Sequence, residues 1–151
     1  MHLYHFESEH WIPLPHVEVF DFFSKATNLE RLMPNWLDFQ TLSPPPIIMQ
    51  EGTEIDYQFK LRFLKMKWRA RIVDWSPPHQ FVDEQTKGPY RFWRHTHLFK
   101  DVEGGCLIKD CVDYAVPLGW LIHRWWVRPD IERIFSIRKH AVEKALGPFP
   151  E

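Results

Sequence analysis

The stretch TEIDYQFKLRF, residues 53–63, carries an apolar side chain at every second position from Ile55 to Phe63. The residues between them are Asp, Gln, Lys and Arg, so the two sets of side chains lie on opposite faces of an extended chain. This alternation predicts a β-strand with one face in the core and one in solvent, as in an antiparallel sheet. Residues 66–75 alternate in the same way after a short link, and the two segments together predict a hairpin.

Segments on both sides of this hairpin also resemble strands. They combine apolar and aromatic residues with polar ones, and they end at Pro, Gly or polar turns. In chain order, the further strands that we expect are 3–12, 36–42, 80–86, 90–99 and 106–116. The last two are separated only by a short polar loop, so they predict a second and longer hairpin.

A spacing of three and four residues, which is typical of helices, occurs in two regions. It predicts a short helix that begins after Pro15, and a second one over residues 29–33 with Asn28 as its N-cap. The last third of the chain, 119–147, shows the apolar stripe of a long amphipathic helix. Pro129 either begins the main part of this helix or kinks a longer one.

The order of elements predicts an α+β fold. One strand is followed by two short helices, about six antiparallel strands and a long C-terminal helix. The apolar face of such a sheet needs a cover, so we expect a curved sheet wrapped around the long helix, with space between them. A length of 151 residues suits one domain, residues 1–151. Aromatic residues make up 16% of the chain, which implies either a bulky core or a cavity lined with rings.

Composition and charge exclude several classes of function. Lys and Arg number 19 against 20 Asp and Glu, which argues against a nucleic-acid partner because such proteins usually carry a basic excess. No apolar run approaches the ~20 residues of a membrane-spanning helix, so stable membrane insertion is not expected. Residues 1–9 lack the basic and apolar regions of a signal peptide. Cys106 and Cys111 point to opposite faces of one strand and cannot pair, and free thiols favour a cytoplasmic protein.

The element order and several motifs resemble the helix-grip fold of the START-like superfamily, also called SRPBCC. They are most similar to a group of small bacterial proteins within it. The motifs include FDFF (20–23), GTEI (52–55), FVDEQ (81–85), WRHTHLF (93–99) and PLG (117–119). The superfamily includes polyketide cyclases and dehydrases, lipid-transfer domains and the birch pollen allergen. The resemblance implies a ligand cavity between sheet and helix, and usually no cofactor. It does not specify a reaction, because the superfamily supports many functions on one fold.

The stretch WRHTHLF (93–99) carries the side chains best suited to chemistry. On a strand, His95 and His97 share one face with the two flanking aromatic residues, and this should be the concave face of the sheet. The same alternation turns Asp110 inward on the following strand and Asp83 inward on the preceding one. We therefore expect a polar cluster of two imidazoles and two carboxylates inside an aromatic cavity.

Three roles stay open for this cluster. A carboxylate raises the pKa of a neighbouring imidazole and fixes its tautomer, so such a pair could hold a ligand carbonyl or hydroxyl, or act as a general base on an enolisable ketone. The same contacts could form a purely structural network that sets strand register. A metal site is the weakest alternative, because His-x-His and one carboxylate are a weak signal alone. No phosphate loop or dinucleotide motif occurs, and we expect neither a metal nor a cofactor.

The expected cavity is mostly apolar, with a few polar anchors. The aromatic residues that should line it are Tyr57, Phe59, Trp68, Trp93 and Phe99. The polar residues that should contact a ligand are Asp83, His95, His97, Asp110 and Tyr114. Arg138 lies on the apolar stripe of the C-terminal helix, where it could reach a carboxylate or a ligand anion, or extend to the cavity rim.

Two segments are candidates for contacts with partners. Residues 60–71 contain six Lys and Arg, mostly on the solvent face of the first hairpin. A solvated sheet face is the simplest explanation, and an anionic partner is the alternative. The segment GWLIHRWWV, residues 119–127, could pack in the core, gate the cavity entrance, or contact a membrane or a protein.

These observations predict that the protein binds a small or medium hydrophobic ligand, such as a lipid, a polyketide, or an aromatic or isoprenoid molecule. The alternative is a cyclase or dehydrase in which His95 or His97 is the general acid or base and Asp110 orients it. A third hypothesis is a chaperone or protein-interaction module that uses the same groove for a partner segment. Loss of turnover with retained binding in a His variant would separate catalysis from simple binding.

Overall fold

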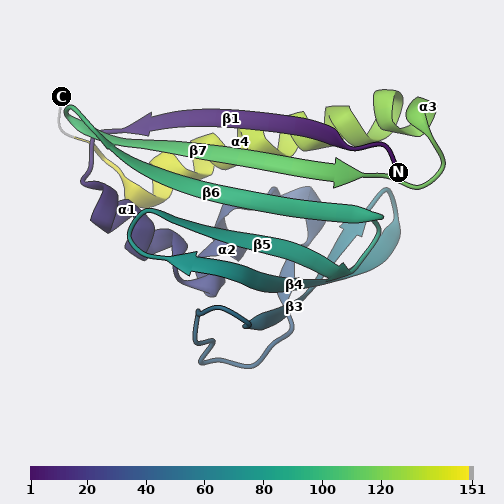
Figure 1. Ribbon diagram of the computed structural model, residues 1–151, viewed down its shortest axis with the longest axis horizontal. Coiled ribbons are helices and arrows are strands. Elements are labelled where there is room, and N and C mark those ends of the chain that lie inside the picture. The colour runs from purple at the N-terminus through teal and green to yellow at the C-terminus, as the bar shows by residue number, and fades with distance from the viewer. Residues whose placement is uncertain (150–151) are drawn as a thin grey trace.

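The computed structural model describes residues 1–149 as a seven-stranded antiparallel sheet that curves around one long helix (Figure 1). The strand order across the sheet is β1-β7-β6-β5-β4-β3-β2. The strands are β1 (Tyr4–Ile12), β2 (Gln40–Thr41), β3 (Glu54–Leu61), β4 (Leu64–Ser76), β5 (Gln80–Lys87), β6 (Phe92–Val102) and β7 (Gly105–Ala115). The helices are α1 (His16–Phe23), α2 (Ala26–Leu32), α3 (Trp120–Ile122) and α4 (Arg128–Leu146), with a 3₁₀ turn η1 (Asn35–Leu37) and a π-helical turn η2 (His123–Val127).

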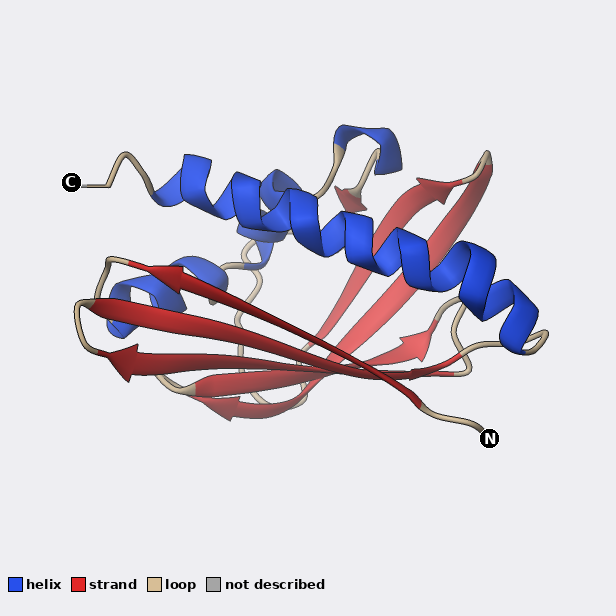
Figure 2. Cartoon of the chain, turned by 90° about the horizontal axis from the view of Figure 1, so that it is seen from above, coloured by secondary structure: helices blue, strands red, loops and turns tan. Residues whose placement is uncertain are grey.

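Helix α4 runs along the concave side of the sheet, and the β3–β4 hairpin rises beside it (Figure 2). The short helices α1 and α2 cover the same side of the sheet, and α1 lies at the end opposite α3 (Figure 1). This arrangement confirms the predicted fold class, a curved antiparallel sheet wrapped around a C-terminal helix with two short helices after the first strand.

Strand β7 shows how the two-residue period positions the core. Every second residue from Cys106 to Tyr114 is buried, and the residues between them are partly exposed. Strand β6 pairs with β7 so that His97 lies opposite Asp110, which brings the inward faces of the two strands together. The two cysteines lie on opposite faces of β7 as free thiols, as predicted.

The first predicted hairpin is also confirmed, with its two-residue turn two positions earlier in the chain than the sequence alternation indicates. Strand β3 ends at Leu61, which lies opposite Leu64, and only Arg62 and Phe63 connect the two strands. Both turn residues have positive φ angles, 48° and 74°. Two positive φ angles match the twist of a two-residue type I′ hairpin, although Asn and Gly are the usual residues there.

The second short helix begins at Ala26, before the predicted N-cap. Asn28 therefore lies inside the helix. Its side-chain amide donates a hydrogen bond of 2.7 Å to the carbonyl oxygen of Phe22, and this bond ties α2 to α1 instead of capping a helix. A residue type that favours N-caps is also suited to other short side-chain to backbone bonds, and here one of those forms.

The predicted strand 36–42 is wrong over most of its length. Residues Asn35–Leu37 form the turn η1, and Asp38 then adopts a left-handed conformation with φ 46°. Only Gln40–Thr41 pairs with β3. Leu37 is buried here, whereas Trp36 and Leu42 are exposed, so this short apolar segment does not have the single buried face of a half-buried strand.

The C-terminal helical region is continuous from Trp120 to Leu146. Pro129 lies in the first turn of α4, a position that proline favours because its φ angle is already helical. The π-helical turn η2 directly precedes it, so the proline begins the main helix while the helical path continues on its N-terminal side. Within residues 1–149, none of the helices combines the length and the apolar character needed to cross a membrane.

Buried side chains form three clusters that surround the space between sheet and helix. The largest lies beneath α1, where Phe20, Phe23, Phe81 and Phe99 pack ring against ring. A second cluster fills the region between β1, β7 and the start of α4, and a third lies between α2 and the β3–β4 hairpin. The apolar sides of these clusters form walls around the space between the sheet and α4.

Candidate functional site

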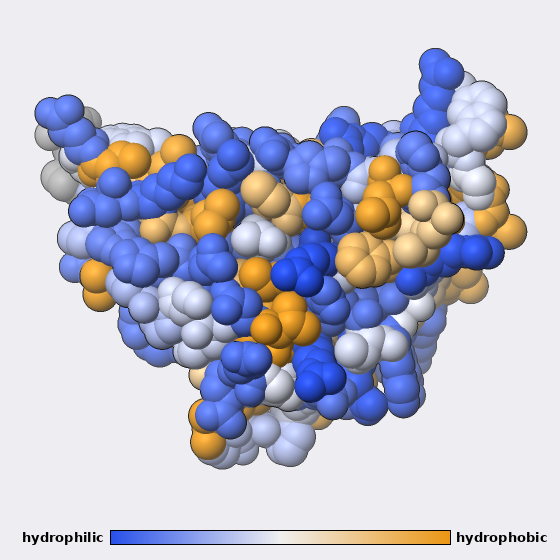
Figure 3. All heavy atoms as spheres, in the orientation of Figure 1, coloured by the Kyte–Doolittle hydropathy of each residue, from blue (hydrophilic) through white to orange (hydrophobic). Residues whose placement is uncertain are grey.

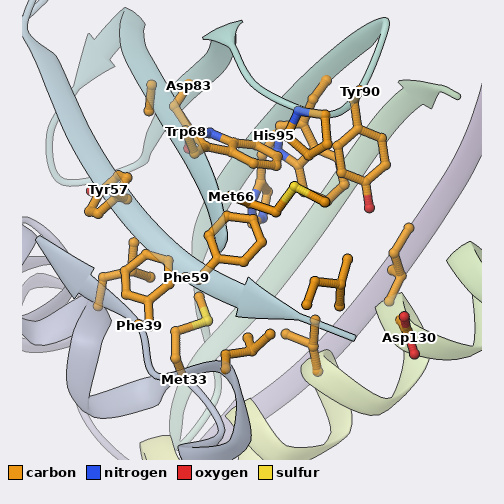
Figure 4. Close-up of a pocket in the computed structure, with 18 of the residues that line it drawn as sticks. Met33, Phe39, Tyr57, Phe59, Met66, Trp68, Asp83, Tyr90, His95 and Asp130 are labelled. Carbon is orange, nitrogen blue, oxygen red and sulfur yellow. The ribbon is translucent and has the colours of Figure 1, made fainter. Parts of the chain in front are cut away.

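A cavity of about 560 Å³ lies between the sheet and α4, and its lining is predominantly apolar (Figure 4). Phe39, Phe59 and Trp68 project into it in Figure 4, and Asp83 and His95 lie close together on the sheet side. Cavities of about 300–1,000 Å³ with mostly apolar walls are typical of sites for drug-sized ligands.

Four of the five aromatic residues predicted to line the cavity do so, namely Tyr57, Phe59, Trp68 and Trp93. They come from β3, β4 and β6, and the Trp68 ring contacts those of Phe59 and Trp93, with the Trp68 and Trp93 centroids 5.2 Å apart. Burial raises the pKa of the Tyr57 phenol, so this group stays protonated and can donate a hydrogen bond.

Phe99 requires a correction, because it lies outside the cavity. It is 1% exposed and packs beneath α1, with its ring centroid 5.3 Å from each of those of Phe20 and Phe23. The alternation of β6 correctly turns Phe99 to the concave face. Helix α1 covers that face at this end of the strand, however, so the residue belongs to the core.

Tyr114 also lies outside the cavity, for a similar reason. Its hydroxyl donates to His123 Nε2 at 2.7 Å and accepts a bond of 3.3 Å from the Arg128 guanidinium. Burial lowers the pKa of His123, which keeps this imidazole neutral and able to accept the bond. Tyr114 therefore anchors the helical segment of η2 and α4 to β7 instead of facing a ligand.

The four residues of the predicted polar cluster lie together. His95 Nε2 is 2.7 Å from Asp110 Oδ1, and His97 Nε2 is 2.7 Å from Asp83 Oδ2. The two imidazole rings stack with centroids 3.6 Å apart. Asp83, His95 and His97 line the cavity, whereas Asp110 lies behind His95 and is not part of the cavity wall. Strand pairing places Asp83 opposite His95 and Asp110 opposite His97, and each hydrogen bond joins a carboxylate to the diagonal histidine two residues away.

Arg138 completes the cluster from the helix side. Its Nη2 lies 3.9 Å from Asp110 Oδ1, and the residue is 5% exposed. The guanidinium also lies over the rings of Phe23 and Phe135, at 5.4 and 5.5 Å from their centroids. Of the two placements predicted for Arg138, the carboxylate contact is the one observed, and the side chain also lines the cavity.

The charges of the cluster follow from its contacts. Burial alone would raise the pKa of Asp110, but the Arg138 charge and the hydrogen bond from His95 outweigh it and lower this pKa. Burial likewise opposes, but does not prevent, the lowering of the pKa of Asp83 by its hydrogen bond with His97. Burial, reinforced by the nearby His95, lowers the pKa of His97 to about 4. Near neutral pH the cluster therefore holds two carboxylates, a guanidinium and a neutral His97.

One buried nitrogen in the cluster has no hydrogen-bond partner. A neutral His97 donates from Nε2 to the ionised Asp83, which leaves Nδ1 as an acceptor. This Nδ1 is buried and without a hydrogen bond, and the nearest charged atom is Asp110 Oδ1 at 3.6 Å, itself an acceptor. Two neighbouring acceptors are satisfied by one molecule that donates to both, and a buried water has the two hydrogens that this requires.

Asp83, His95 and His97 also have the donor set of a metal site. One ligand atom from each lies within 4.8 Å of the others. Both imidazole Nε2 atoms, however, are already hydrogen-bonded to carboxylates. A divalent ion would have to replace the bond between His97 and Asp83, since ligands about 2.1 Å from one metal lie farther apart than 2.7 Å in tetrahedral geometry.

Sequence patterns missed several cavity residues. Leu29, Leu32 and Met33, from α2 and its end, line the wall opposite β3. Tyr90 lines it from the β5–β6 loop, which Gln85 holds through side-chain bonds of 2.8 and 3.0 Å to the backbone of Tyr90. No periodic signal identifies a loop residue as cavity-facing. The sequence shows that α2 has an apolar side, but it does not show the surface against which that side packs.

A family model described as polyketide cyclase / dehydrase and lipid transport matches residues 12–143. The chain belongs to this family. No curated protein matches the chain by sequence. The polyketide cyclase / dehydrase and lipid transport family has the START-like, Bet v 1-like architecture, and the element order and long C-terminal helix of this member fit that helix-grip fold.

Solved structures support the same fold. The Zhui aromatase/cyclase from Streptomyces sp. R1128 superposes with a TM-score of 0.75 at 12% identity, over 95% of this chain and 93% of that one. The ginseng major latex-like protein 151 from Panax ginseng superposes with a TM-score of 0.72 at 10% identity, over 97% and 99%. Protein CV1439 from Chromobacterium violaceum superposes with a TM-score of 0.75 at 11% identity, over 96% of this chain and 98% of that one. Family and fold together support a hydrophobic ligand-binding or polyketide cyclase-like role.

Proposed function

We propose that the protein binds one hydrophobic ligand of drug-like size in the cavity, with a polar end of that ligand directed at the His–Asp cluster. The observation that carries this proposal is the cavity itself. It has a volume of about 560 Å³, apolar walls, and a group of buried polar side chains on its sheet side. An apolar body matches the aromatic walls, and one polar end matches the cluster.

The cluster favours a hydroxyl as the polar end of the ligand. Asp83 is part of the cavity wall, and its lowered pKa keeps it ionised, so its carboxylate is an acceptor. A ligand hydroxyl that donates to this carboxylate would form a charge-assisted hydrogen bond. A ligand carboxylate is disfavoured, because both carboxylates of the cluster are ionised.

Native mass spectrometry of the freshly purified protein is the first test. We expect an added mass of a few hundred daltons that is lost when the same sample is denatured. An added mass close to that of one divalent ion would instead show that Asp83, His95 and His97 hold a metal. A chain without added mass is then tested with the neutral fluorescent probe N-phenyl-1-naphthylamine, and failure of this apolar probe to bind would contradict the proposal.

A pair of neighbouring variants controls the experiment. Met66 lines the cavity, whereas Lys67 is the next residue on β4 and is exposed on the other face. Met66→Trp should fill part of the cavity and weaken ligand or probe binding at least tenfold, while Lys67→Trp adds the same ring outside and should bind as the wild type does. Equal binding by the two variants would place the ligand elsewhere.

The second candidate function is acid–base catalysis on a carbonyl ligand. The observation that favours it is the pairing of His95 with Asp110. His95 lines the cavity, and the ionised carboxylate behind it holds the ring through Nε2, which leaves Nδ1 for a substrate proton. His95→Gln should then abolish turnover of enolisable ketones while ligand affinity stays within a few-fold. A protein that only binds would show no turnover in either form.

A further inference from the structure

Large apolar side chains gather on the surface at one end of the molecule. We call the set the aromatic rim, and it consists of Phe63, Leu64, Leu118, Trp120, Leu121, Trp125 and Trp126, all of them exposed. Phe63 is fully exposed, and Trp120 and Trp125 are 61% and 65% exposed. Figure 3 shows orange and pale side chains among blue ones at the end of the molecule where α3 lies. Scattered apolar residues are normal on a surface, but a cluster of this kind marks a binding surface.

The rim is built from two chain segments that contact each other. The tip of the β3–β4 hairpin supplies Phe63 and Leu64, and the segment from Leu118 through η2 supplies the rest. Arg62 joins the two segments. Its Nη2 lies 3.2 Å from Asp130 Oδ1, and its guanidinium lies 5.3 Å from the Trp126 ring centroid. The two parts therefore form one surface.

The hairpin tip holds its aromatic ring in solvent at a conformational cost. Phe63 has a φ angle of 74°, and a bulky residue in this left-handed region is a strained exception. Nothing within residues 1–149 covers the ring, since the residue is fully exposed. A turn residue such as Asn or Gly would relieve both the strain and the apolar exposure, so the phenylalanine does not serve the fold.

The rim surrounds an opening of the cavity. Leu64, Leu118 and Trp126 are exposed residues of the rim and also line the cavity. An apolar ligand that enters or leaves here would pass directly from the cavity to whatever apolar phase contacts the rim.

Charge around the rim is predominantly basic. The acidic groups beside it are already in ion pairs, Asp130 with Arg62 and Glu132 with Arg128. Lys65 on the hairpin and Arg124 on η2 have no acidic partner within the part of the chain that the structure describes, and Arg124 lies over the Trp125 ring at 5.5 Å. His123 of η2 contacts Tyr114 and is neutral.

We propose that the aromatic rim docks on the surface of a bilayer that contains anionic phospholipids. Trp rings that neighbour Arg and Lys suit the interface between headgroups and acyl chains. Lys65 and Arg124 beside the rim favour an anionic surface, where each basic residue strengthens binding by about fivefold. This docking goes beyond ligand binding in the cavity, because it states where an apolar ligand is collected or delivered. It is interfacial, and it needs no membrane-spanning helix.

Co-sedimentation with lipid vesicles tests the proposal. The vesicles are phosphatidylcholine alone, or phosphatidylcholine with about a third phosphatidylglycerol, a charge density that attracts basic residues. We expect the full chain to bind the anionic vesicles at low salt, to bind the neutral ones less, and to lose affinity at about 1 M salt, where charges are screened beyond about 3 Å.

The variants separate the rim from other exposed tryptophans. Trp120 and Trp125 do not line the cavity, so the double variant Trp120→Ser/Trp125→Ser leaves its walls unchanged. Its affinity for anionic vesicles should be at least about tenfold lower than that of the wild type, because two large apolar groups no longer enter the interface. Trp11 is 50% exposed on β1, at the opposite end of the molecule, and Trp11→Ser should bind as the wild type does.

A charge variant tests whether the basic residues beside the aromatic rim attract anionic lipids. Arg124→Glu should reduce binding to anionic vesicles by about fivefold or more and leave binding to neutral vesicles unchanged. Lys100→Glu, at an exposed position of β6 far from α3, is the matched control.

Two results would overturn the proposal. One is a wild-type chain that does not bind anionic vesicles, or that binds them equally well after the Trp120→Ser/Trp125→Ser change. The other is a stable dimer in analytical ultracentrifugation that dissociates in the double variant and binds no vesicles, which would make a second copy of the chain the partner of the rim. Neither result bears on the cavity, because Met66→Trp tests that separately.

Discussion

Replacement of His97 by glutamine should remove much of the acid sensitivity of folding. His97 is 5% exposed, and burial together with the neighbouring His95 lowers its pKa to about 4. In the unfolded chain the pKa of a histidine is about 6.5. As the pH falls below about 6.5, the unfolded state takes up a proton that the folded state does not bind. The stability from a neutral His97 is therefore complete above this pH and is lost progressively as the pH falls to about 4.

The magnitude follows from the two pKa values. A difference of one unit corresponds to 1.36 kcal/mol, so about 2.5 units correspond to a total loss of about 3 kcal/mol, of which about 2 kcal/mol falls between pH 7 and pH 5. The carboxylates of Asp83 and Asp110 do not contribute in this interval. Their folded pKa values are lowered, so the stability that they provide is lost only below about pH 4.

Urea unfolding followed by tryptophan fluorescence at a series of pH values measures this slope. Glutamine keeps an N–H donor for Asp83 but cannot titrate, so His97→Gln should unfold with a pH dependence about 2 kcal/mol smaller between pH 7 and pH 5. His79→Gln, at an exposed position, controls for loss of a histidine and should follow the wild-type curve. If His97→Gln keeps the full wild-type slope, the neutral state assigned to His97 is wrong.

Three other substitutions test the arrangement of the core and the cavity. Arg138→Met leaves the buried Asp110 carboxylate without its cation and should cost about 3–5 kcal/mol in urea unfolding, and a loss below about 1 kcal/mol would show that the contact is unimportant. Phe99→Ala should also cost about 3–5 kcal/mol, but should leave the affinity for N-phenyl-1-naphthylamine unchanged, because the ring lies outside the cavity. Arg62→Ala breaks the partly exposed pair with Asp130 and should change stability by less than about 1 kcal/mol, while stopped-flow mixing with the same probe should show faster entry and exit. Unchanged rates would argue against passage of the probe between hairpin tip and helix.

Strand alternation carried most of the information that the sequence holds about the sheet. The faces predicted for Ile55, Tyr57 and Phe59 on β3 are those observed, because a half-buried antiparallel strand leaves no other pattern. The same rule placed Asp83, His97 and Asp110 on one concave surface, where strand pairing then brings them into contact. That these residues contact a ligand stays a prediction.

Alternation identifies a face, but it does not indicate what covers that face. Phe99 and Tyr114 point inward as predicted, yet α1 covers one and η2 binds the other. This information depends on how helices distant in sequence dock, and no local pattern contains it. The left-handed residue Asp38 and the early start of α2 at Ala26 have a different cause, because there local bonds outweigh the residue preferences that sequence analysis uses.

The pairing of β1 with β7 has a consequence for synthesis on the ribosome. His5 and Asp113, whose side chains contact across these strands, are 108 positions apart. At about 5–20 residues per second, β1 waits roughly 5–20 s before β7, the strand that pairs with it in the sheet, has been made. During that time Phe6 and Ile12, both buried in the finished structure, have no strand beside them. A chaperone that shields the first strand of the nascent chain would therefore increase the yield of folded protein more than one that acts after release.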